Sequence, residues 1–299
     1  MDLRKLEIFC KVIDLKSFSK AGEAVYLTQP TISEHIKFLE EHLGTRLIDR
    51  MGKEVIPTKA GEILYGYGKK MLDLRVEAKQ AIENLSGKMT GEIAVGGSNI
   101  PGEYVIPHLL GKFKNNYPDI SVFLKIGDTK EIIEEVLNHR IEMGVVGAKI
   151  QDKRLQYNEF IQDELVLVVP PSHRWASTVS IKPAELQDEP FILRERGSGT
   201  RMTMESVFHD VGIHLDTMKI IAEMGSTEAI RQGIKAGVGI SLLSKRSVED
   251  ELRLGMLRQI RIENLRSFRN FYIVFHRART KSPLVEVFFH FLMEYSSGI

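Results

Sequence analysis

The sequence has little cysteine and no long apolar stretches. Cys10 is the single cysteine among 299 residues, so an internal disulfide is impossible and a reducing compartment is expected. No apolar run reaches the about 18 residues that a membrane span requires. The N-terminus also lacks the basic-then-apolar pattern of a secretory signal peptide. We therefore expect a cytoplasmic protein that does not cross a membrane.

Net charge is almost absent as well. The chain has 41 Lys and Arg residues against 40 Asp and Glu residues, a formal net charge of +1. Bulk electrostatics therefore do not favour polyanion binding, although a local basic surface can still contact phosphates. Hydrophobic and charged residues make up 43% and 27% of the chain, which excludes disorder or a fibrous repeat for the whole chain. The length suggests two domains.

Signatures of catalysis and of metal binding are missing too. The nine histidines show no metal-ligand spacing. The chain contains no Gly-x-Ser-x-Gly motif, no phosphate-binding loop and no dinucleotide fingerprint. We expect no catalytic residues, no metal and no cofactor.

The first 58 residues have the pattern of short helices followed by a hairpin. Asp2, Ser17 and Thr28 are suited to cap three helices, and Gly44 ends the third. Residues 47–57 then alternate as two short strands around a turn at 51–53.

The second and third of these helices form a candidate helix-turn-helix, in which the later helix would enter the DNA major groove. With Ile32, Ile36 and Leu39 buried, the exposed side chains of that helix are Gln29, Pro30, Thr31, Ser33, Glu34, Lys37 and Glu41. Gln, Ser and Thr can hydrogen-bond to base edges, and Lys to phosphate or guanine. Three cations beside the helix suit phosphate contact: Arg46, Arg50 and Lys53. An ordinary three-helix cluster has the same spacing, and charge does not decide, because basic and acidic residues balance over 1–58.

Residues 59–88 are expected to form one long helix after the cap Thr58, ended by Ser86-Gly87-Lys88. Apolar residues keep a helical period along it: Ile63, Leu64, Tyr67, Met71, Leu74, Ala78, Ala81, Ile82 and Leu85. A helix of this length without a local core usually packs on a partner, often a second copy of itself.

From Gly91 onward, short apolar strands alternate with helices. Strands are expected at 92–96, 120–126, 143–147, 165–169, 191–193, 219–222 and 239–243, and helices at 104–117, 129–138 and 285–293. The alternation predicts an α/β fold with a parallel sheet. Residues 89–299 are many for one sheet, and Pro170-Pro171 suggests a division into two lobes.

Turns rich in Gly, Ser and Thr follow several of these strands, at 96–100, 127–129, 197–201 and 225–227. Ligands of open α/β folds bind at the carboxyl ends of strands, and a helix N-terminus after such a turn attracts an anion. The same residues also serve as ordinary caps and turns. The candidate ligand-binding residues are Ser98, Asn99, Ile100, Thr129, Ser198, Gly199, Thr200 and Arg201.

One motif extends through the N-terminal segment: Leu6-x-x-Phe9, Ser17-Phe18-Ser19-Lys20-Ala21, Leu27-Thr28-Gln29-Pro30-Thr31-Ile32-Ser33, Ile36, Leu39-Glu40, Leu43-Gly44, Leu47-Ile48-x-Arg50 and Thr58-x-Ala60-Gly61. This motif resembles the DNA-binding domain of LysR-type transcriptional regulators. The resemblance implies a winged helix-turn-helix at 1–58, a dimerising linker helix at 59–88 and a two-lobed effector domain at 89–299. The effector domain would be periplasmic-binding-protein-like (type II), with lobe I at about 89–162 plus 268–299 and lobe II at about 163–267.

The resemblance also implies roles for single residues. Gln29, Pro30, Thr31 and Ser33 would approach base edges, and Lys37 and Arg50 the DNA backbone. Many members of the family have Arg where this chain has Glu34, which can instead accept from a cytosine N4 amine. An effector would bind between the lobes near Ser98-Asn99, Thr129 and Thr200. The run at 194–201 is similar to the branch that regulates carbon fixation and sulfur or selenium assimilation.

The leading hypothesis is a transcriptional regulator whose oligomer geometry on DNA responds to a small anionic metabolite. Its expected partners are double-stranded promoter or operator DNA, the effector, a second or further copies in a homodimer or homotetramer, and RNA polymerase. A two-lobed α/β enzyme is an alternative, opposed by the missing nucleophile–base pair. A solute-binding protein is another, opposed by the N-terminal helices and the missing signal peptide.

Overall fold

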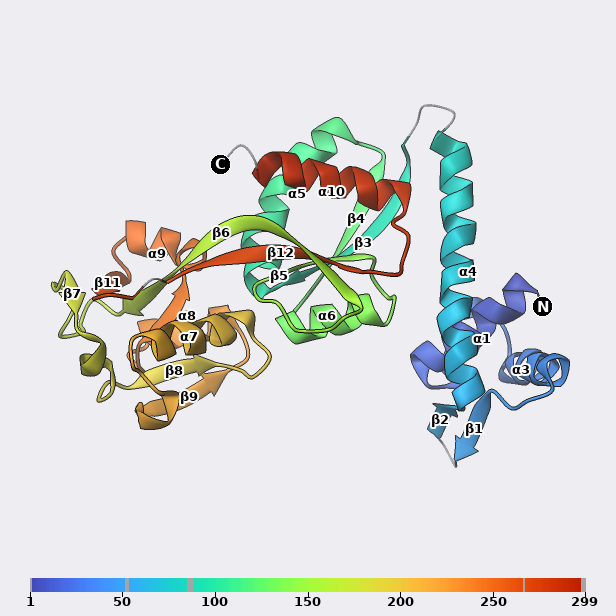
Figure 1. Ribbon diagram of the computed structural model, residues 1–299, viewed down its shortest axis with the longest axis horizontal. Coiled ribbons are helices and arrows are strands. Elements are labelled where there is room, and N and C mark those ends of the chain that lie inside the picture. The colour runs from blue at the N-terminus through green and yellow to red at the C-terminus, as the bar shows by residue number, and fades with distance from the viewer. Residues whose placement is uncertain (1, 52–53, 85–88, 266, 297–299) are drawn as a thin grey trace. The chain divides into compact units, whose positions relative to one another are not determined.

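The computed structural model describes residues 2–51, 54–84, 89–265 and 267–296. It divides into two units, Met1–Lys88 and Met89–Ile299, and each is described by itself (Figure 1). In the described part of the chain, no helix is both long enough and apolar enough to span a membrane.

Three short helices open the first unit: α1 (Leu3–Leu15), α2 (Phe18–Val25) and α3 (Gln29–Leu43). The predicted caps are confirmed, because Asp2, Ser17 and Thr28 each accept a hydrogen bond from a backbone N–H of the first turn. Gly44 ends α3 with φ of 66°, a left-handed conformation that glycine adopts without strain. The apolar faces of the three helices form one core with Ile32 and Leu39 fully buried.

The predicted hairpin is also present, as antiparallel strands β1 (Ile48–Met51) and β2 (Glu54–Pro57). Residues 52–53 at its tip, with the candidate Lys53, lie outside the described residues, as does the predicted helix end at 86–88. Helix α4 (Lys59–Asn84) follows, with Thr58 Oγ1 accepting from the Gly61 N–H at 3.1 Å.

Helix α4 packs on α1 through Gly68, where an added Cβ would lie 3.1 Å from Cys10 Sγ. Burial at this contact raises the pKa of Cys10 to about 12, so the thiol stays protonated at neutral pH. Cys10 is thus a core residue, as its place on an apolar helix face indicated.

The second unit is built on a mixed eight-stranded sheet with the order β4-β3-β5-β12-β6-β11-β7, and β10 also pairs with β6. Its strands are β3 (Gly91–Ser98), β4 (Ile120–Gly127), β5 (Met143–Val146), β6 (Leu155–Val169), β7 (Ser180–Ile181), β10 (Ser241–Ser244), β11 (Arg258–Ile262) and β12 (Phe268–His276). A separate parallel pair is formed by β8 (Phe191–Arg194) and β9 (Ile220–Met224).

The predicted α/β fold is confirmed, but the sheet is mixed and not parallel throughout. Strands β3, β4 and β5 are parallel, but β12 is antiparallel to both β5 and β6. The first part of β6 and all of β12 were not expected as strands, because polar residues interrupt their apolar pattern. These two strands are long enough to pass through both halves of the unit (Figure 1).

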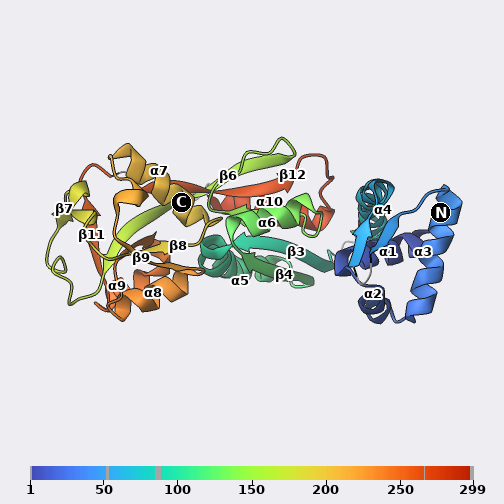
Figure 2. The same ribbon diagram turned by 90° about the horizontal axis from the view of Figure 1, so that it is seen from below.

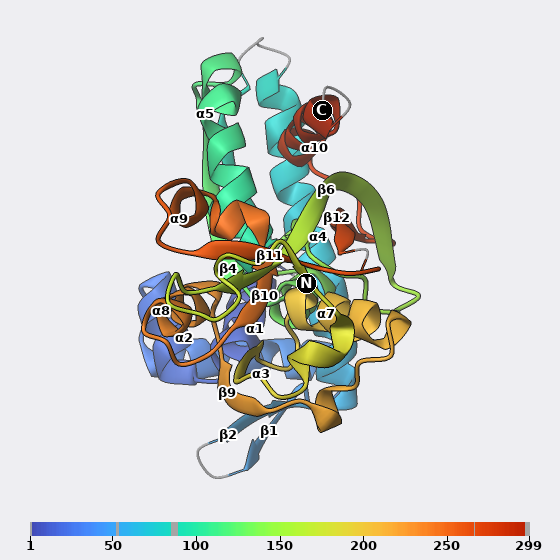
Figure 3. The ribbon, with the colours of Figure 1, turned by 90° about the vertical axis from the view of Figure 1, so that its left-hand side faces the viewer.

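Two groups of elements form the halves. The first half contains β3, β4 and β5 with α5 (Ile106–Asn116), α6 (Thr129–Leu137) and α10 (Pro283–Ser296). Helices α5 and α10 pack side by side against one face of the sheet, and α6 packs on the other (Figures 1 and 3).

The second half contains β7 to β11 with α7 (Gly199–Asp210), α8 (Thr227–Lys235) and α9 (Glu249–Arg253). Helix α7 belongs to one core cluster and α8 to another on the opposite side of the strands (Figure 2). Short helical turns complete the unit: η1 (Pro101–Val105), η2 (Pro183–Leu186), η3 (Leu215–Thr217) and η4 (Lys245–Ser247). Trp175, the single tryptophan, is buried in the core beside α7.

Candidate functional site

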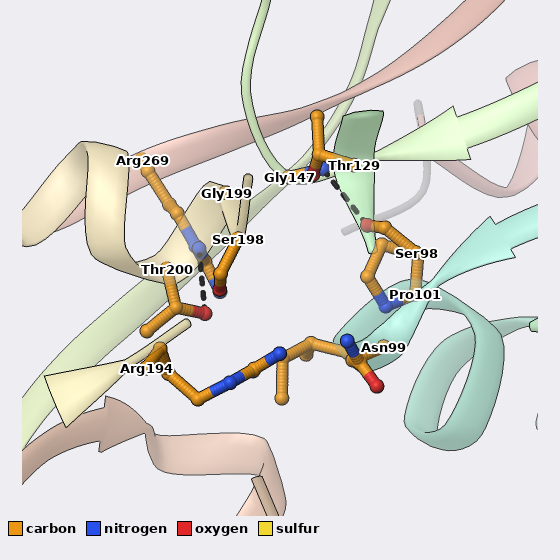
Figure 4. Close-up of a pocket in the computed structure, with 11 residues that line it drawn as sticks. Ser98, Asn99, Pro101, Thr129, Gly147, Arg194, Ser198, Gly199, Thr200 and Arg269 are labelled. Atoms are coloured by element: carbon orange, nitrogen blue, oxygen red, sulfur yellow. Dashed lines mark hydrogen bonds between the residues drawn. The ribbon is translucent and has the colours of Figure 1, made fainter. Parts of the chain in front are cut away.

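A narrow polar cavity lies between the two halves of the second unit (Figure 4). Its lining comes from both halves and from β12: Ser98, Asn99, Ile100, Pro101, Thr129, Gly147, Arg194, Ser198, Gly199, Thr200 and Arg269. Pockets for drug-sized ligands usually measure about 300–1,000 Å³. This cavity is far narrower, with about 10 Å³ open to the centre of a water molecule, so as it stands it has room for only a small polar group.

The local structure of the first half places the end of β3 against the end of β5. The Gly147 N–H donates to Ser98 Oγ at 3.1 Å, which joins the two strand ends at the cavity wall (Figure 4). Both strands end at the same edge because they are parallel to each other. Seven of the eight ligand-binding residues predicted from sequence line this cavity.

Two helix N-termini meet at the cavity. Helix α6 begins at Thr129 in the first half, and α7 begins at Gly199 in the second half. The N-cap residue of α7, Ser198, makes no capping hydrogen bond with its side chain. Helix N-termini present free N–H groups and partial positive charge, which favour an anion. At α6 the capping box of Asp128 and Glu131 offsets part of this charge, so α7 offers the more open N-terminus.

Two buried arginines add donors to the cavity. Arg194 is 2% exposed and donates to both carboxylate oxygens of Glu195, at 2.6 and 2.7 Å, and to Thr227 Oγ1 at 2.9 Å. Arg269 Nε donates to Asp163 Oδ2 at 2.9 Å, and Nη1 to Thr200 Oγ1 at 3.2 Å. The lining described above includes both arginines and no carboxylate.

Asp163, which does not line the cavity, forms an ion pair with Arg269. Its fully buried carboxylate also accepts from Ser244 Oγ at 2.7 Å. Burial lowers the pKa of Arg269, and the charge of Asp163 opposes that shift. An arginine remains protonated in proteins even so. The ion pair therefore keeps a cationic group at the cavity wall.

Three buried polar atoms of the cavity lining make no hydrogen bond within the described chain: Thr129 Oγ1, Ser198 Oγ and Arg269 Nη2. Arg269 Nη2 lies 2.9 Å from Asp163 Oδ2 but in an orientation that forms no hydrogen bond. A buried donor without a partner costs about 1–3 kcal/mol. A ligand that supplies acceptor oxygens would satisfy all three atoms.

The expectation for Arg201 is not supported by its position. Its guanidinium donates to Glu205 at 2.9 Å, to Glu223 at 2.6 Å and to the Arg194 carbonyl at 3.0 Å, and it does not line the cavity. These hydrogen bonds hold the guanidinium outside the cavity lining. The charged groups at the cavity are Arg194 and Arg269 instead.

Sequence reasoning missed Arg269 as a site residue, although a signal was present. Arg269 alternates with Phe271 and Ile273 along β12, and all three side chains are buried. A charged residue on the buried side of an alternating strand requires a polar partner. Arg194, which directly follows the apolar strand residues 191–193, was noted only as part of a family motif.

The candidate DNA-binding residues lie on the exposed side of α3. Gln29 Nε2 donates to Ser33 Oγ at 2.9 Å, and Lys37 pairs with Glu41 at 3.5 Å. Pro30 and Thr31 lie in the same first turn, and Glu34 is exposed one turn later.

Arg46 is brought close to this side of α3. A groove lined by Ser33, Glu34, Lys37 and Arg46 runs along α3 and the start of β1. Glu40 Oε1 accepts from the backbone N–H groups of Leu47 and Ile48, which attaches the hairpin to α3. Arg50 lies on β1, and its side chain is not among those described.

Comparison with known protein families shows to which family this chain belongs. The family described as "LysR substrate binding domain" matches residues 86–297, and "Bacterial regulatory helix-turn-helix protein, lysR family" matches residues 3–62. The chain belongs to the LysR family of transcriptional regulators. It is a DNA-binding regulator with an effector domain, and the enzyme alternative is set aside.

Relatives of this LysR-type regulator match along nearly the whole chain. A "Probable RuBisCO transcriptional regulator" of Cyanidium caldarium is 31% identical over 96% of this chain and 92% of its own length. The transcriptional activator CmpR of Synechocystis is 29% identical over 99% of this chain and 96% of its own length. These relatives agree with the resemblance to carbon-fixation regulators.

Solved structures of LysR-type proteins show the same fold. The regulatory domain of Synechocystis CcmR, in complex with 2-PG, is 30% identical, has a TM-score of 0.65, and covers 70% of this chain and 99% of that domain. CbnR complexed with its target DNA has a TM-score of 0.68 at 21% identity, covering 99% of this chain and 100% of CbnR.

Replacing Asp163 by Ala should lower the free energy of unfolding by about 3–5 kcal/mol, because it leaves the charge of Arg269 buried without its partner. The matched control is the neighbouring Glu164→Ala, which removes a partly exposed pair with Lys245 and should cost about 0–1 kcal/mol. Urea unfolding followed by Trp175 fluorescence measures both. Equal losses for the two variants would contradict the role of the buried pair.

Proposed function

We propose that this LysR-type regulator senses a small anionic metabolite in the cavity between the two halves of its effector domain. The observation that carries the proposal is a set of three buried atoms that form no hydrogen bond within the described chain: Thr129 Oγ1 and Ser198 Oγ at two helix N-termini, and Arg269 Nη2 beside them. The complex of the related CcmR domain with 2-PG supports a ligand of this chemistry.

Binding would depend on hydrogen bonds more than on net charge. Arg194 is already paired with Glu195, and Arg269 with Asp163. The anion would therefore accept directed hydrogen bonds from the cavity wall. The charges of the two arginines are already balanced by the carboxylates of Glu195 and Asp163. The proposed contacts are Ser98, Asn99, Ile100, Thr129, Ser198, Gly199 and Thr200, with Arg194 and Arg269 in place of Arg201.

Replacing Ser198 by Ala separates binding from stability. Since Ser198 Oγ has no hydrogen-bond partner within the described chain, its loss should leave the free energy of unfolding unchanged or slightly higher. Calorimetric titration with 2-PG and with inorganic phosphate should show about tenfold weaker binding or more, because a hydrogen bond to a charged ligand is lost.

The matched control for this change is Ser241→Ala. Ser241 Oγ is buried and donates to the Ile192 carbonyl at 2.8 Å, away from the cavity lining. This variant should lose about 1–3 kcal/mol of stability and keep its affinity for anions. Unchanged binding by Ser198→Ala would exclude Ser198 from the site.

On DNA, we propose that the N-terminal part of α3 reads base edges in the major groove. Gln29, Pro30, Thr31 and Ser33 would contact bases, and Glu34 would accept from a cytosine N4 amine. The phosphate contacts would come from Lys37, Arg46, Arg50 and Lys53.

Joint replacement of Gln29 and Ser33 by Ala should remove most sequence-specific affinity, since each good base contact is worth about 1–3 kcal/mol. Fluorescence anisotropy on DNA from upstream of the protein's own gene, with non-specific competitor, measures it. The control Glu62→Gln, exposed on α4, should bind as the wild type does. Unchanged competitor-resistant binding by the double variant would contradict the assignment.

We further propose that α4 assembles the protein into homodimers. An exposed stripe follows one side of this helix, away from its contact with α1: Ile63, Tyr67, Met71, Leu74 and Ile82. A second copy of the helix would cover it, as in other helix pairs. Contacts between effector domains could then build a homotetramer.

A double change of Met71 and Leu74 to Glu should produce monomers, because it places charges in the apolar interface of α4. Val76→Glu is the matched control, since Val76 is an exposed apolar residue of α4 outside the stripe. Sedimentation velocity gives the assembly state of each variant. Dimers that persist in the double variant would refute the interface.

These parts combine into one proposed mechanism. An anion bound between the two halves would favour one relative angle of the halves and so change the packing of effector domains in the oligomer. The spacing of paired DNA-binding units on their half-sites would follow. RNA polymerase is the proposed further partner at the promoter.

A further inference from the structure

The two halves of the effector domain touch each other at Gly199, where α7 begins. A Cβ added to Gly199 would lie 2.6 Å from Thr129 Oγ1 and 3.0 Å from the carbonyl carbon of Gly147, both in the first half. It would also lie 3.1 Å from the Ala148 nitrogen. No side chain fits in this space without moving the halves apart, because two of these neighbours are backbone atoms.

Gly197 makes a second close approach beside the first. Its φ of +103° is a conformation that other residues rarely adopt. A Cβ on Gly197 would lie 3.0 Å from Asp128 Oδ2 and 3.5 Å from Lys130 Cβ. The turn at 197–199 in the second half is therefore seated on the N-terminus of α6 in the first half.

This contact brings the N-termini of α6 and α7 together. Helix N-termini present partial positive charge, and at α6 the carboxylates of Asp128 and Glu131 form a capping box that offsets part of it. The buried hydroxyls of Thr129 and Ser198, one from each helix end, are both unpartnered within the described chain. An anion between the helix ends would accept hydrogen bonds from both hydroxyls.

We propose that Gly199 determines how closely the two halves approach, and thereby restricts the site to compact anions that both helix ends and Arg269 reach at once. The inference rests on the proposed anion site and adds its specificity determinant. A larger residue at position 199 would keep the halves apart and leave the anion bound to one half only.

The first test is Gly199→Ala. Calorimetric titration with 2-PG and inorganic phosphate should show about tenfold weaker binding or more, because an overpacked contact prevents closure. Gly111→Ala is the matched control, since a Cβ on this glycine of α5 meets no atom within 4 Å. Wild-type affinity in Gly199→Ala would overturn the inference alone, whereas absence of anion binding by the wild type would overturn the proposed function with it.

The second test closes the halves covalently. In the double variant Lys130→Cys and Gly197→Cys, the Cβ atoms would be 3.5 Å apart, within the range of about 3.5–4.5 Å for disulfides. Cys10 would not interfere, because it is buried and its pKa is raised to about 12. Trp175 fluorescence on urea unfolding checks that the reduced variant folds.

The oxidised double variant should bind promoter DNA without anion as the wild type binds it with anion, and reduction should restore the anion response. Gly197→Cys alone carries the same backbone strain at φ of +103°, so it is the control and should still require anion under both conditions. An oxidised form that contains the disulfide and still requires anion would overturn the inference.

Discussion

The effector domain depends on one buried ion pair, between Asp163 on β6 and Arg269 on β12. These strands join the two halves, and Arg269 also donates to Thr200 at the start of α7. Removing two charges from water costs as much as their attraction returns, so such a pair is seldom a net source of stability. Its consequence is positional: it holds a guanidinium at the point where the two halves and the cavity meet.

The cavity combines balanced charges with unsatisfied donors. Each arginine at the cavity has a carboxylate behind it, while the hydroxyls of Thr129 and Ser198 have no partner within the described chain. A site of this kind selects a ligand by the number and direction of its acceptor oxygens. In the proposed site, the absence of a side chain at Gly199 would let donors from both halves reach the same ligand, so that recognition would depend on how closely the halves approach.

The DNA-binding unit is built differently from the cavity. Its candidate DNA-contacting side chains are exposed, and its core is formed by residues that are close together in the sequence. Helices α1 to α3 bury one another, and Glu40 attaches the hairpin to α3 through two backbone N–H groups. In the proposed dimer, the exposed stripe on α4 would bind the second copy that a paired operator requires. Sequence-specific binding would then depend on assembly, whereas the proposed anion site is formed by residues of one chain.

The sequence by itself determined the features that depend on neighbouring residues: the caps Asp2, Ser17 and Thr28, the hairpin, helix α4 and the parallel strands β3 to β5. Their causes are local hydrogen bonds and hydrophobic periodicity, which a single segment contains. The antiparallel course of β6 and β12, and the pairing of Asp163 with Arg269 across 106 positions, were decided only by the tertiary structure. So was the choice of Arg269 over Arg201 at the cavity, because nearby carboxylates, and not sequence spacing, determine where each guanidinium lies.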